Sequence, residues 1–254
     1  MNIYETDKLL SEYLLFHYGT RHEIAPPAGT EHALDYAVRC VVECLDPTAL
    51  PAGARALDVG CAVGRSTFEL ARHCAAVIGI DFSQRFIEAA EAIRVTSGLP
   101  YTRTDEGALT TPLTARRPDG IPADRVSFET GDAMALRENL GAFDVVLAAN
   151  LIDRLTNPSA FLARLPSLVK PGGQLVLTSP YTWMEEFTPR ERWVGGYQRE
   201  GLRVATLAGL RAVLEEDFTL TDVRDLPFLI REHARKFQFS VAQASIWRRN
   251  EEAT

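Results

Sequence analysis

The chain has 254 residues, of which 46% are hydrophobic, so it can bury a full core as one large domain or two small ones. Its formal net charge is −7 at pH 7, and it contains no long run of Lys and Arg. Binding to DNA or RNA depends on neutralising phosphates, so this charge argues against a nucleic-acid partner and suits a small-molecule substrate.

The first 50 residues are predicted to form two helices joined by a loop. Apolar side chains at helical spacing indicate a helix over residues 4–18, and Gly19 is a typical helix stop. Two prolines within residues 22–29 indicate a loop. A second helix is expected over residues 31–45, where one stripe is apolar: Leu34, Ala37, Val38, Val41, Val42 and Leu45.

The next segment, residues 55–70, has the pattern of a strand, a glycine turn and a helix. Residues 56–59 are a short apolar run, as in a strand that is buried on both faces. Gly60 and Gly64 break this run before a helical pattern begins. Glycine allows a ligand to approach backbone N–H groups at the start of a helix, so the turn predicts a ligand site.

The spacing of the turn separates several nucleotide-binding motifs. Asp58-x-Gly60-x-x-x-Gly64 lacks the middle glycine of the dinucleotide fingerprint and the Gly-Lys-Ser/Thr of a phosphate-binding loop. A second buried strand, residues 77–81, ends in Asp81, 21 residues after Gly60, where doubly wound folds place an acid on ribose hydroxyls. The two motifs together resemble those of class I S-adenosylmethionine-dependent methyltransferases. An NAD-binding dehydrogenase is the weaker interpretation, because the middle glycine is missing.

Strands and helices then alternate, which is typical of a parallel sheet covered on both faces. Ser83 is predicted to cap the helix after the second strand, and Asn157, followed by proline, is predicted to begin another helix. Residues 97–124 are rich in Thr, Pro and Gly without periodicity, and a long loop is expected there. Further strands are expected over residues 125–130, 143–149 and 174–179.

The end of the chain breaks this rhythm. A helix is expected over residues 206–216, then strands near residues 218–224 and 237–247 that are too close for a helix between them, so the two are antiparallel. The chain is therefore predicted to be α/β, with the Rossmann-like class I methyltransferase fold: a mostly parallel seven-stranded sheet with an antiparallel last strand. Residues 1–254 are expected to form a single domain, with a helical cap over residues 1–50 and a cofactor-binding core over residues 51–250.

The resemblance to class I methyltransferases implies a site for S-adenosyl-L-methionine at the carboxyl ends of the strands. The turn from Gly60 to Gly64 would hold the methionyl carboxylate, with Asp58 attracting the ammonium directly or through water. Asp81 would accept hydrogen bonds from the ribose hydroxyls. The remaining contacts, including those to adenine, are expected from Phe82, Asp132, Ala133, Met134 and Asn150.

Three further stretches carry a closer resemblance, and they lie over residues 4–19, 179–189 and 228–240. They are similar to the methyltransferases of ovothiol biosynthesis. This resemblance implies methylation of a ring nitrogen of 5-thiohistidine (4-mercaptohistidine). It also implies a functional link to a sulfoxide synthase and a sulfoxide lyase. The alternatives are a methyltransferase for another small molecule and a non-catalytic S-adenosylmethionine-binding regulatory protein.

The acceptor is expected to meet side chains at the same edge of the sheet. Residues 1–19 and 180–197 are predicted to cover it, with aromatic walls from Tyr181, Trp183, Trp193 and Tyr197. Asn150, Tyr181 and Trp183 are expected to set the plane of the acceptor ring, with packing in the core as the alternative for the aromatic residues. Arg231 is expected to bind a carboxylate, with an ion pair to Glu232 as the alternative. His17 and His233 are candidate bases.

Two expectations concern location and metals. The chain has no apolar run near the roughly 20 residues of a membrane span and no visible secretory signal at its start, so a cytoplasmic protein without a membrane partner is expected. The four cysteines match no zinc pattern and are expected to be reduced core residues, with no bound metal. They are Cys40, Cys44, Cys61 and Cys74.

Overall fold

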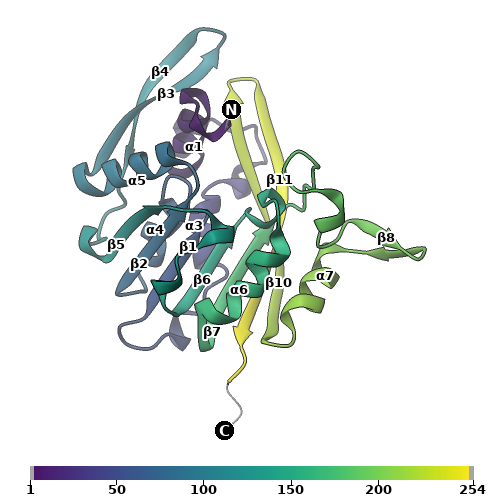
Figure 1. The fold of residues 1–254 in the computed structure, drawn as a ribbon. Coiled ribbons are helices and arrows are strands. Elements are labelled where there is room, and N and C mark those ends of the chain that lie inside the picture. Colours follow the sequence, from purple (N-terminus) through teal and green to yellow (C-terminus); the bar gives the residue numbers. More distant parts are fainter. Residues whose placement is uncertain (1–2, 252–254) are drawn as a thin grey trace.

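The computed structural model describes residues 3–251 (Figure 1). Its main sheet has seven strands in the order β10-β11-β7-β6-β1-β2-β5. Their bounds are β1 (Arg55–Val59), β2 (Ala76–Asp81), β5 (Val126–Thr130), β6 (Phe143–Ala149), β7 (Val169–Ser179), β10 (Phe218–His233) and β11 (Lys236–Arg249). The strands β5, β2, β1, β6 and β7 pair in parallel, whereas β11 is antiparallel to both of its neighbours. The expected mostly parallel sheet with an antiparallel last strand is therefore confirmed.

Helices cover the sheet on both faces. The α-helices are α1 (Asp7–Tyr18), α2 (Arg21–Ile24), α3 (Tyr36–Val42), α4 (Arg65–Leu70), α5 (Gln84–Thr96), α6 (Pro158–Leu168) and α7 (Thr206–Leu214). Ser83 caps α5, and Asn157 with the following proline begins α6, both as predicted. Within residues 3–251, no helix is long and apolar enough to cross a membrane.

Two hydrophobic cores lie on opposite faces of the sheet, because successive side chains of a strand point to opposite sides. Ala56 of β1 and Val145 of β6 enter the core formed with α1, α3, α4 and α5. Their neighbours Leu57 and Val146 enter the second core, formed with α6 and α7. All four cysteines are free and buried, as expected.

The N-terminal region differs in detail from the two predicted helices. α1 begins at Asp7, and Gly19 is its C-cap as predicted. The expected loop contains the short helix α2, because Thr20 and Glu23 form a reciprocal capping box. The second predicted helix is divided into a 3-10 turn (Glu31–Ala33) and α3, since Asp35 adopts a left-handed backbone conformation between them. The buried face of α3 is formed by Tyr36, Ala37, Cys40 and Val41, whereas Val42 is 53% exposed, so its assignment to the apolar stripe was wrong.

Residues 97–124 do not form the long loop that was predicted. They contain an antiparallel hairpin, β3 (Gly98–Glu106) and β4 (Leu109–Arg116), which projects beside α1 and α5 in Figure 1. Only Leu99, Tyr101, Leu113 and Ala115 alternate toward the core, and the other side chains are mainly polar, so the strand pattern in the sequence is short and weak. A second small hairpin, β8 (Tyr197–Arg199) and β9 (Leu202–Val204), follows β7.

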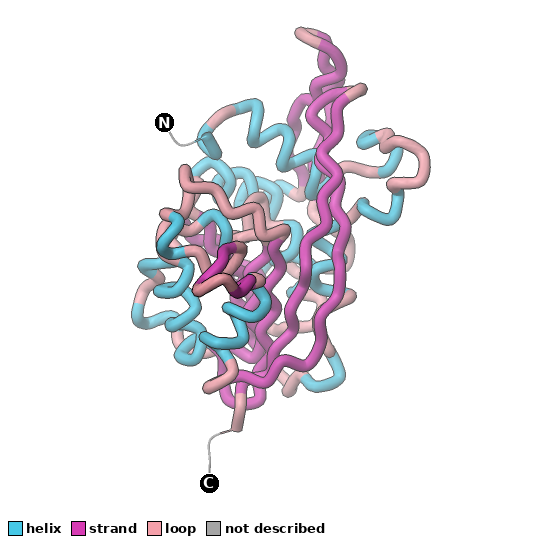
Figure 2. The backbone as a smooth tube through the Cα atoms, turned by 90° about the vertical axis from the view of Figure 1, so that its right-hand side faces the viewer, coloured by secondary structure: helices cyan, strands magenta, loops and turns pink. Residues whose placement is uncertain are grey.

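The last two strands are longer than predicted. Residues 225–236, which separate the two predicted strands, are mostly strand, because β10 continues to His233 and β11 begins at Lys236. β7 pairs with β11 only from residue 243 onward, so the outer half of this hairpin extends beyond the parallel sheet, as Figure 2 shows. This extension brings Phe228 and Ile230 to the end of the sheet where the cavity described below lies.

Candidate functional site

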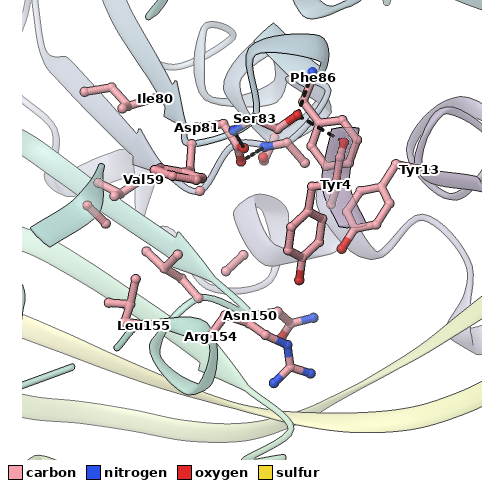
Figure 3. A pocket seen from close by; sticks show the side chains of 18 of the residues that line it. Tyr4, Tyr13, Val59, Ile80, Asp81, Ser83, Phe86, Asn150, Arg154 and Leu155 are labelled. Atoms are coloured by element: carbon pink, nitrogen blue, oxygen red, sulfur yellow. Dashed lines mark hydrogen bonds between the residues drawn. The ribbon is translucent and has the colours of Figure 1, made fainter. Parts of the chain in front are cut away.

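A cavity of about 490 Å³ lies at the carboxyl ends of β1, β2 and β6. This volume is within the roughly 300–1,000 Å³ typical of small-molecule sites, and the position is the one that open α/β sheets use for ligands. One side, the strand-end half, is lined by Gly60, Ala62, Asp81, Phe82, Asp132 and Ala133. The other side, the aromatic half, is lined by Tyr4, Tyr13, Phe16, Tyr36, Phe86 and Phe228. Figure 3 shows this arrangement with Asp81 on one side and Tyr4 and Tyr13 on the other.

Asp58 is fully buried beneath the glycine turn and does not line the cavity. Its Oδ2 accepts hydrogen bonds from the hydroxyls of Ser66 and Thr67, each over 2.7 Å. Its Oδ1 is buried and has no partner among the described residues. Burial raises the pKa of this carboxyl to about 6, although the two hydroxyls oppose the shift. Ser66 lines the cavity, so Asp58 is one side chain away from a ligand.

The two glycines of the turn have different environments. Gly60 lines the cavity with a φ of 78°, in the position expected for a ligand-binding backbone. Gly64 does not line the cavity, contrary to its predicted role. It begins α4 with a φ of 84°, and a Cβ there would lie 2.5 Å from the ring of Phe128. Gly64 is therefore required for close packing of the turn on β5.

Asp81 and Ser83 connect the two halves of the cavity. Asp81 Oδ2 accepts the backbone N–H of Ala62 over 2.9 Å, and Oδ1 accepts that of Ser83 over 2.8 Å. Both oxygens keep further lone pairs for a ligand. The Ser83 hydroxyl caps α5 and donates to the backbone oxygen of Tyr4 over 3.2 Å. Ser83 thus holds both the carboxylate of Asp81 in the strand-end half and the backbone of Tyr4 in the aromatic half.

The loop after β5 completes the strand-end half. Asp132 Oδ1 accepts the backbone N–H of Met134 over 2.9 Å, which fixes the carboxylate at the rim of the cavity. Ala133 and Met134 line the cavity beside it. Phe82 also lines the cavity and is 65% exposed, so its ring is available to a ligand. All four residues therefore line the cavity, and their contacts to the cofactor stay a prediction.

Asn150 stands at the end of β6, where the two halves meet. Its backbone is left-handed, with a φ of 52°. Its Oδ1 accepts the hydroxyl proton of Tyr36 over 2.7 Å, and the Tyr36 oxygen lies 2.6 Å from the Thr178 hydroxyl. The Thr178 hydroxyl also donates to Asn150 Oδ1 over 3.3 Å, so the Asn150 oxygen accepts from both hydroxyls. With its oxygen occupied in this way, Asn150 presents its amide N–H groups to the cavity.

Helix α1 provides much of the aromatic half. The Tyr13 ring lies 4.7 Å from that of Phe86 and 5.9 Å from that of His17, which it stacks on. Burial lowers the pKa of His17 to about 3, so this candidate base is neutral at pH 7 and weakly basic. Residues 1–19 were predicted to cover the acceptor, and the described part of that segment borders the cavity.

The other half of the predicted cover does not reach the cavity. Tyr181 and Trp183 pack against the second core, on the far face of the sheet. The Tyr181 hydroxyl donates to Gln243 and the Trp183 indole to Thr206. Trp183 also stacks on Trp193, with ring centres 6.3 Å apart. These side chains therefore act as core residues, which was the alternative interpretation of the aromatic segment.

Arg231 also lies away from the cavity. It is 5% exposed, donates to the backbone oxygen of Ile24, and pairs with Asp105 of the β3–β4 hairpin over 2.9 Å. It cannot hold an acceptor carboxylate in this position, and its partner is Asp105 instead of Glu232. His233 does not line the cavity and accepts a backbone N–H at the tip of the β10–β11 hairpin.

Sequence analysis missed two contributors to the cavity. Tyr13 and Phe16 are three residues apart on α1 and line the cavity together with Tyr4 of the preceding turn, but only part of that pattern was recognised. Arg154 lines the cavity four residues after Asn150, and its position just past a strand end was an available signal. Figure 3 shows Arg154 on the same side of the cavity as Asn150.

The part of the chain that forms the strand-end half is similar to known methyltransferases. Residues 57–175 match a family model described as a methyltransferase domain. The chain is 30% identical over 129 residues to a ubiquinone biosynthesis O-methyltransferase of Xanthomonas axonopodis pv. citri, covering 51% of this chain and 44% of that protein. It is 27% identical over 177 residues to the S-adenosyl-L-methionine-dependent Diels-Alderase iccD of Talaromyces variabilis, covering 68% and 53%. The chain therefore spans about half the length of these curated relatives.

A solved structure adds evidence on the fold. A SAM-dependent methyltransferase from Methanosarcina mazei superposes with a TM-score of 0.53 at 19% identity, over 82% of this chain and all of that one. The Rossmann-like methyltransferase fold is therefore confirmed. For residues 57–175, the match to a methyltransferase domain agrees with the expected enzyme class and with S-adenosyl-L-methionine as its cofactor. The acceptor is a separate question, because these relatives are named for different reactions.

Proposed function

We propose that this chain, whose residues 57–175 form an S-adenosylmethionine-dependent methyltransferase domain, methylates an imidazole nitrogen of 5-thiohistidine to give ovothiol A. The observation that carries the proposal is the aromatic half of the cavity. Six rings from α1, α3, α5, β10 and the N-terminal turn line a space next to the strand-end half, which suits a flat ring as acceptor. The resemblance of residues 4–19 and 228–240 to ovothiol methyltransferases covers the same walls.

The strand-end half fits the cofactor. Within residues 3–251 one buried oxygen of Asp58 has no partner, and both Asp81 and Gly60 line the cavity. In the proposed arrangement Asp81 accepts the ribose hydroxyls, Gly60 lies next to the methionyl group, and Asp132 and Ala133 meet the adenine. When bound, the cofactor supplies a methyl group on a positively charged sulfur.

The acceptor requires alignment more than acid–base chemistry. The lone pair of a neutral ring nitrogen bonds to the methyl carbon while the carbon–sulfur bond breaks and its electron pair stays on the cofactor sulfur. The methylated ring then loses its other N–H proton to water. His17 is too weakly basic to be needed for this proton. The aromatic side chains exclude water and hold the ring in line with the methyl group.

Selectivity for nitrogen needs a group that restrains the sulfur, because a thiolate is intrinsically the better nucleophile. Asn150 lines the cavity at the junction of the two halves, where its amide N–H groups can donate. In the proposed complex they donate to the thiolate and keep it off the methyl axis. The enzyme would act after a sulfoxide synthase and a sulfoxide lyase have placed sulfur on the ring, and we propose that residues 1–254 form one domain for this step.

The direct test is product identification with 5-thiohistidine and histidine run side by side. We expect an N-methyl product from 5-thiohistidine and poor turnover of histidine, because the donors for sulfur would be left unpaired. Mass spectrometry and NMR identify the methylated atom. An S-methyl or O-methyl product, equal rates on the two acceptors, or cofactor binding without turnover would contradict the proposal, the last favouring a regulatory protein.

Replacing Tyr36 by Phe tests the orientation of Asn150. Without the hydroxyl, Asn150 Oδ1 keeps only the longer hydrogen bond from Thr178, over 3.3 Å, so its amide is held less firmly. We expect kcat to fall about tenfold, the equivalent of one hydrogen bond, and the S-methyl fraction of product to rise. Cofactor affinity should stay unchanged. Tyr101→Phe, a buried tyrosine outside the cavity, is the matched control and should leave the product ratio unaltered.

The raised pKa of Asp58 predicts a pH dependence of cofactor binding. Between about pH 4 and 6, Asp58 is protonated in the folded protein but ionised in the unfolded chain, because its folded-state pKa is about 6. The free energy of unfolding therefore falls as the pH rises through this range. An ammonium group nearby favours the ionised form. We therefore expect cofactor affinity to rise with pH through about 6 and binding at pH 6 to release protons.

Calorimetry at pH 6 and pH 8, in two buffers of different ionisation enthalpy, measures that release. Asp58→Asn is the control, since it removes the titrating group and should abolish the buffer dependence at pH 6. Proton uptake, or an equal release by the variant, would show that Asp58 does not sense the cofactor.

A further inference from the structure

Arg154 is the one lysine or arginine among the described residues that line the cavity. It ends the 3-10 turn (Ile152–Arg154) that follows Asn150. The acids that line the cavity, Asp81 and Asp132, belong to the strand-end half, whereas Arg154 lies across from them beside Tyr4 (Figure 3). His17 is neutral, so the positive charge of the acceptor side comes from Arg154.

The guanidinium of Arg154 is held in a fixed orientation. Its Nη1 makes three hydrogen bonds, to Asp153 O over 2.9 Å, Asp153 Oδ2 over 3.1 Å and Thr182 O over 3.0 Å. The ring of Phe187 stacks below it, 4.9 Å from the guanidinium carbon. All three hydrogen bonds use Nη1, so the edge formed by Nε and Nη2 is not engaged by Asp153 or Thr182.

The carboxylate of Asp153 cannot turn toward the cavity to neutralise that edge. It is buried, and its Oδ2 also accepts the backbone N–H of Thr182 over 2.9 Å. The Tyr4 hydroxyl is hydrogen-bonded to Arg154 on the cavity side, and a bound carboxylate would share or replace this contact. An arginine that only tied residues 153 and 182 together would need just Nη1. The Nε–Nη2 edge instead matches the two oxygens of a carboxylate.

We infer that Arg154 binds a carboxylate of the acceptor, so that this enzyme takes a small ring compound bearing an acid group and discriminates against the decarboxylated amine. The inference rests on the proposed function and deepens it by adding a specificity-determining residue. Arg154 takes the role that was predicted for Arg231. Pre-organisation by Asp153, Thr182 and Phe187 lowers the entropy lost when the carboxylate binds.

The experiment compares 5-thiohistidine with its decarboxylated analogue, 5-thiohistamine. Calorimetry measures the affinity of each for protein loaded with S-adenosylhomocysteine, and steady-state assays give KM and kcat. The wild-type protein should bind the acid roughly 10- to 100-fold more tightly than the amine. Arg154→Gln should abolish this preference by weakening the binding of the acid alone. Arg154→Lys should retain part of the preference, because lysine keeps the positive charge but cannot donate two parallel hydrogen bonds.

Arg192→Gln is the matched control. Arg192 donates to the backbone oxygen of Thr156 but does not line the cavity, so its loss should leave the preference intact. Cofactor affinity and thermal unfolding verify that each variant is folded. Equal binding of acid and amine by the wild-type protein, equal weakening of both by Arg154→Gln, or no binding of either would overturn the inference. A preference for the acid without methyl transfer would sustain the inference and overturn the proposed function.

Discussion

Replacing Asp81 by Asn is expected to lower the affinity for S-adenosylmethionine roughly 10- to 100-fold. The carboxylate already accepts N–H groups from Ala62 and Ser83, and its remaining lone pairs face the cavity. The amide would place N–H groups against one of these backbone donors and remove an acceptor for the ribose. A lost charge-assisted hydrogen bond is equivalent to about 1.5–3 kcal/mol. Calorimetry with the cofactor alone measures the effect.

Two controls separate binding from folding in this variant. Thermal unfolding without ligand reports any loss of stability from the altered Ala62 and Ser83 contacts. Asp119→Asn removes the same charge from an exposed residue that does not line the cavity, and should leave affinity unchanged. Unchanged affinity in the Asp81 variant would exclude this carboxylate from the cofactor site.

Gly64→Ala is expected to have the largest effect on folding, with a loss of about 2–5 kcal/mol in the free energy of unfolding. About 1–2 kcal/mol comes from a side chain in the left-handed conformation, and about 1–3 kcal/mol from overpacking. The new methyl group would meet Phe128 at 2.5 Å and Ala90 at 3.1 Å. Urea denaturation of the ligand-free protein measures the loss.

Gly60→Ala is the comparison for Gly64→Ala. Its backbone is equally left-handed, but the new methyl group would meet only the flexible side chain of Leu151, at 3.0 Å. We expect the free energy of unfolding to fall by about 1–2 kcal/mol, from the strained backbone alone. The double variant Gly64→Ala, Phe128→Leu should recover part of the larger loss. Equal destabilisation by the two alanine variants would refute the packing role assigned to Gly64.

The strand-end half could be predicted because its signals are local. A few consecutive residues are enough to identify each of its parts: a buried strand, a glycine turn and an acid at the end of the next strand. Parallel pairing then brings Gly60, Asp81 and Asp132 to one edge of the sheet. The same reasoning gave the caps of α5 and α6, since a capping side chain bonds to N–H groups two or three residues away.

The acceptor side depends on tertiary contacts that spacing does not reveal. Whether Tyr181 and Trp183 face the cavity or the second core depends on how the chain turns after β7. Arg231 was misplaced because its partner, Asp105, is on a hairpin that the sequence suggested to be a loop. Arg154 follows a strand end directly, yet its role depends on Thr182 and Phe187, which are distant in sequence.

The position of Ser83 has a thermodynamic consequence. One serine holds Asp81 through its N–H and the Tyr4 backbone through its hydroxyl, so the two halves of the cavity share a support. A ligand that stiffens Asp81 then also restricts the wall that meets the acceptor. By linkage, the coupling free energy is the same in both directions, so each ligand would raise the affinity for the other by an equal factor.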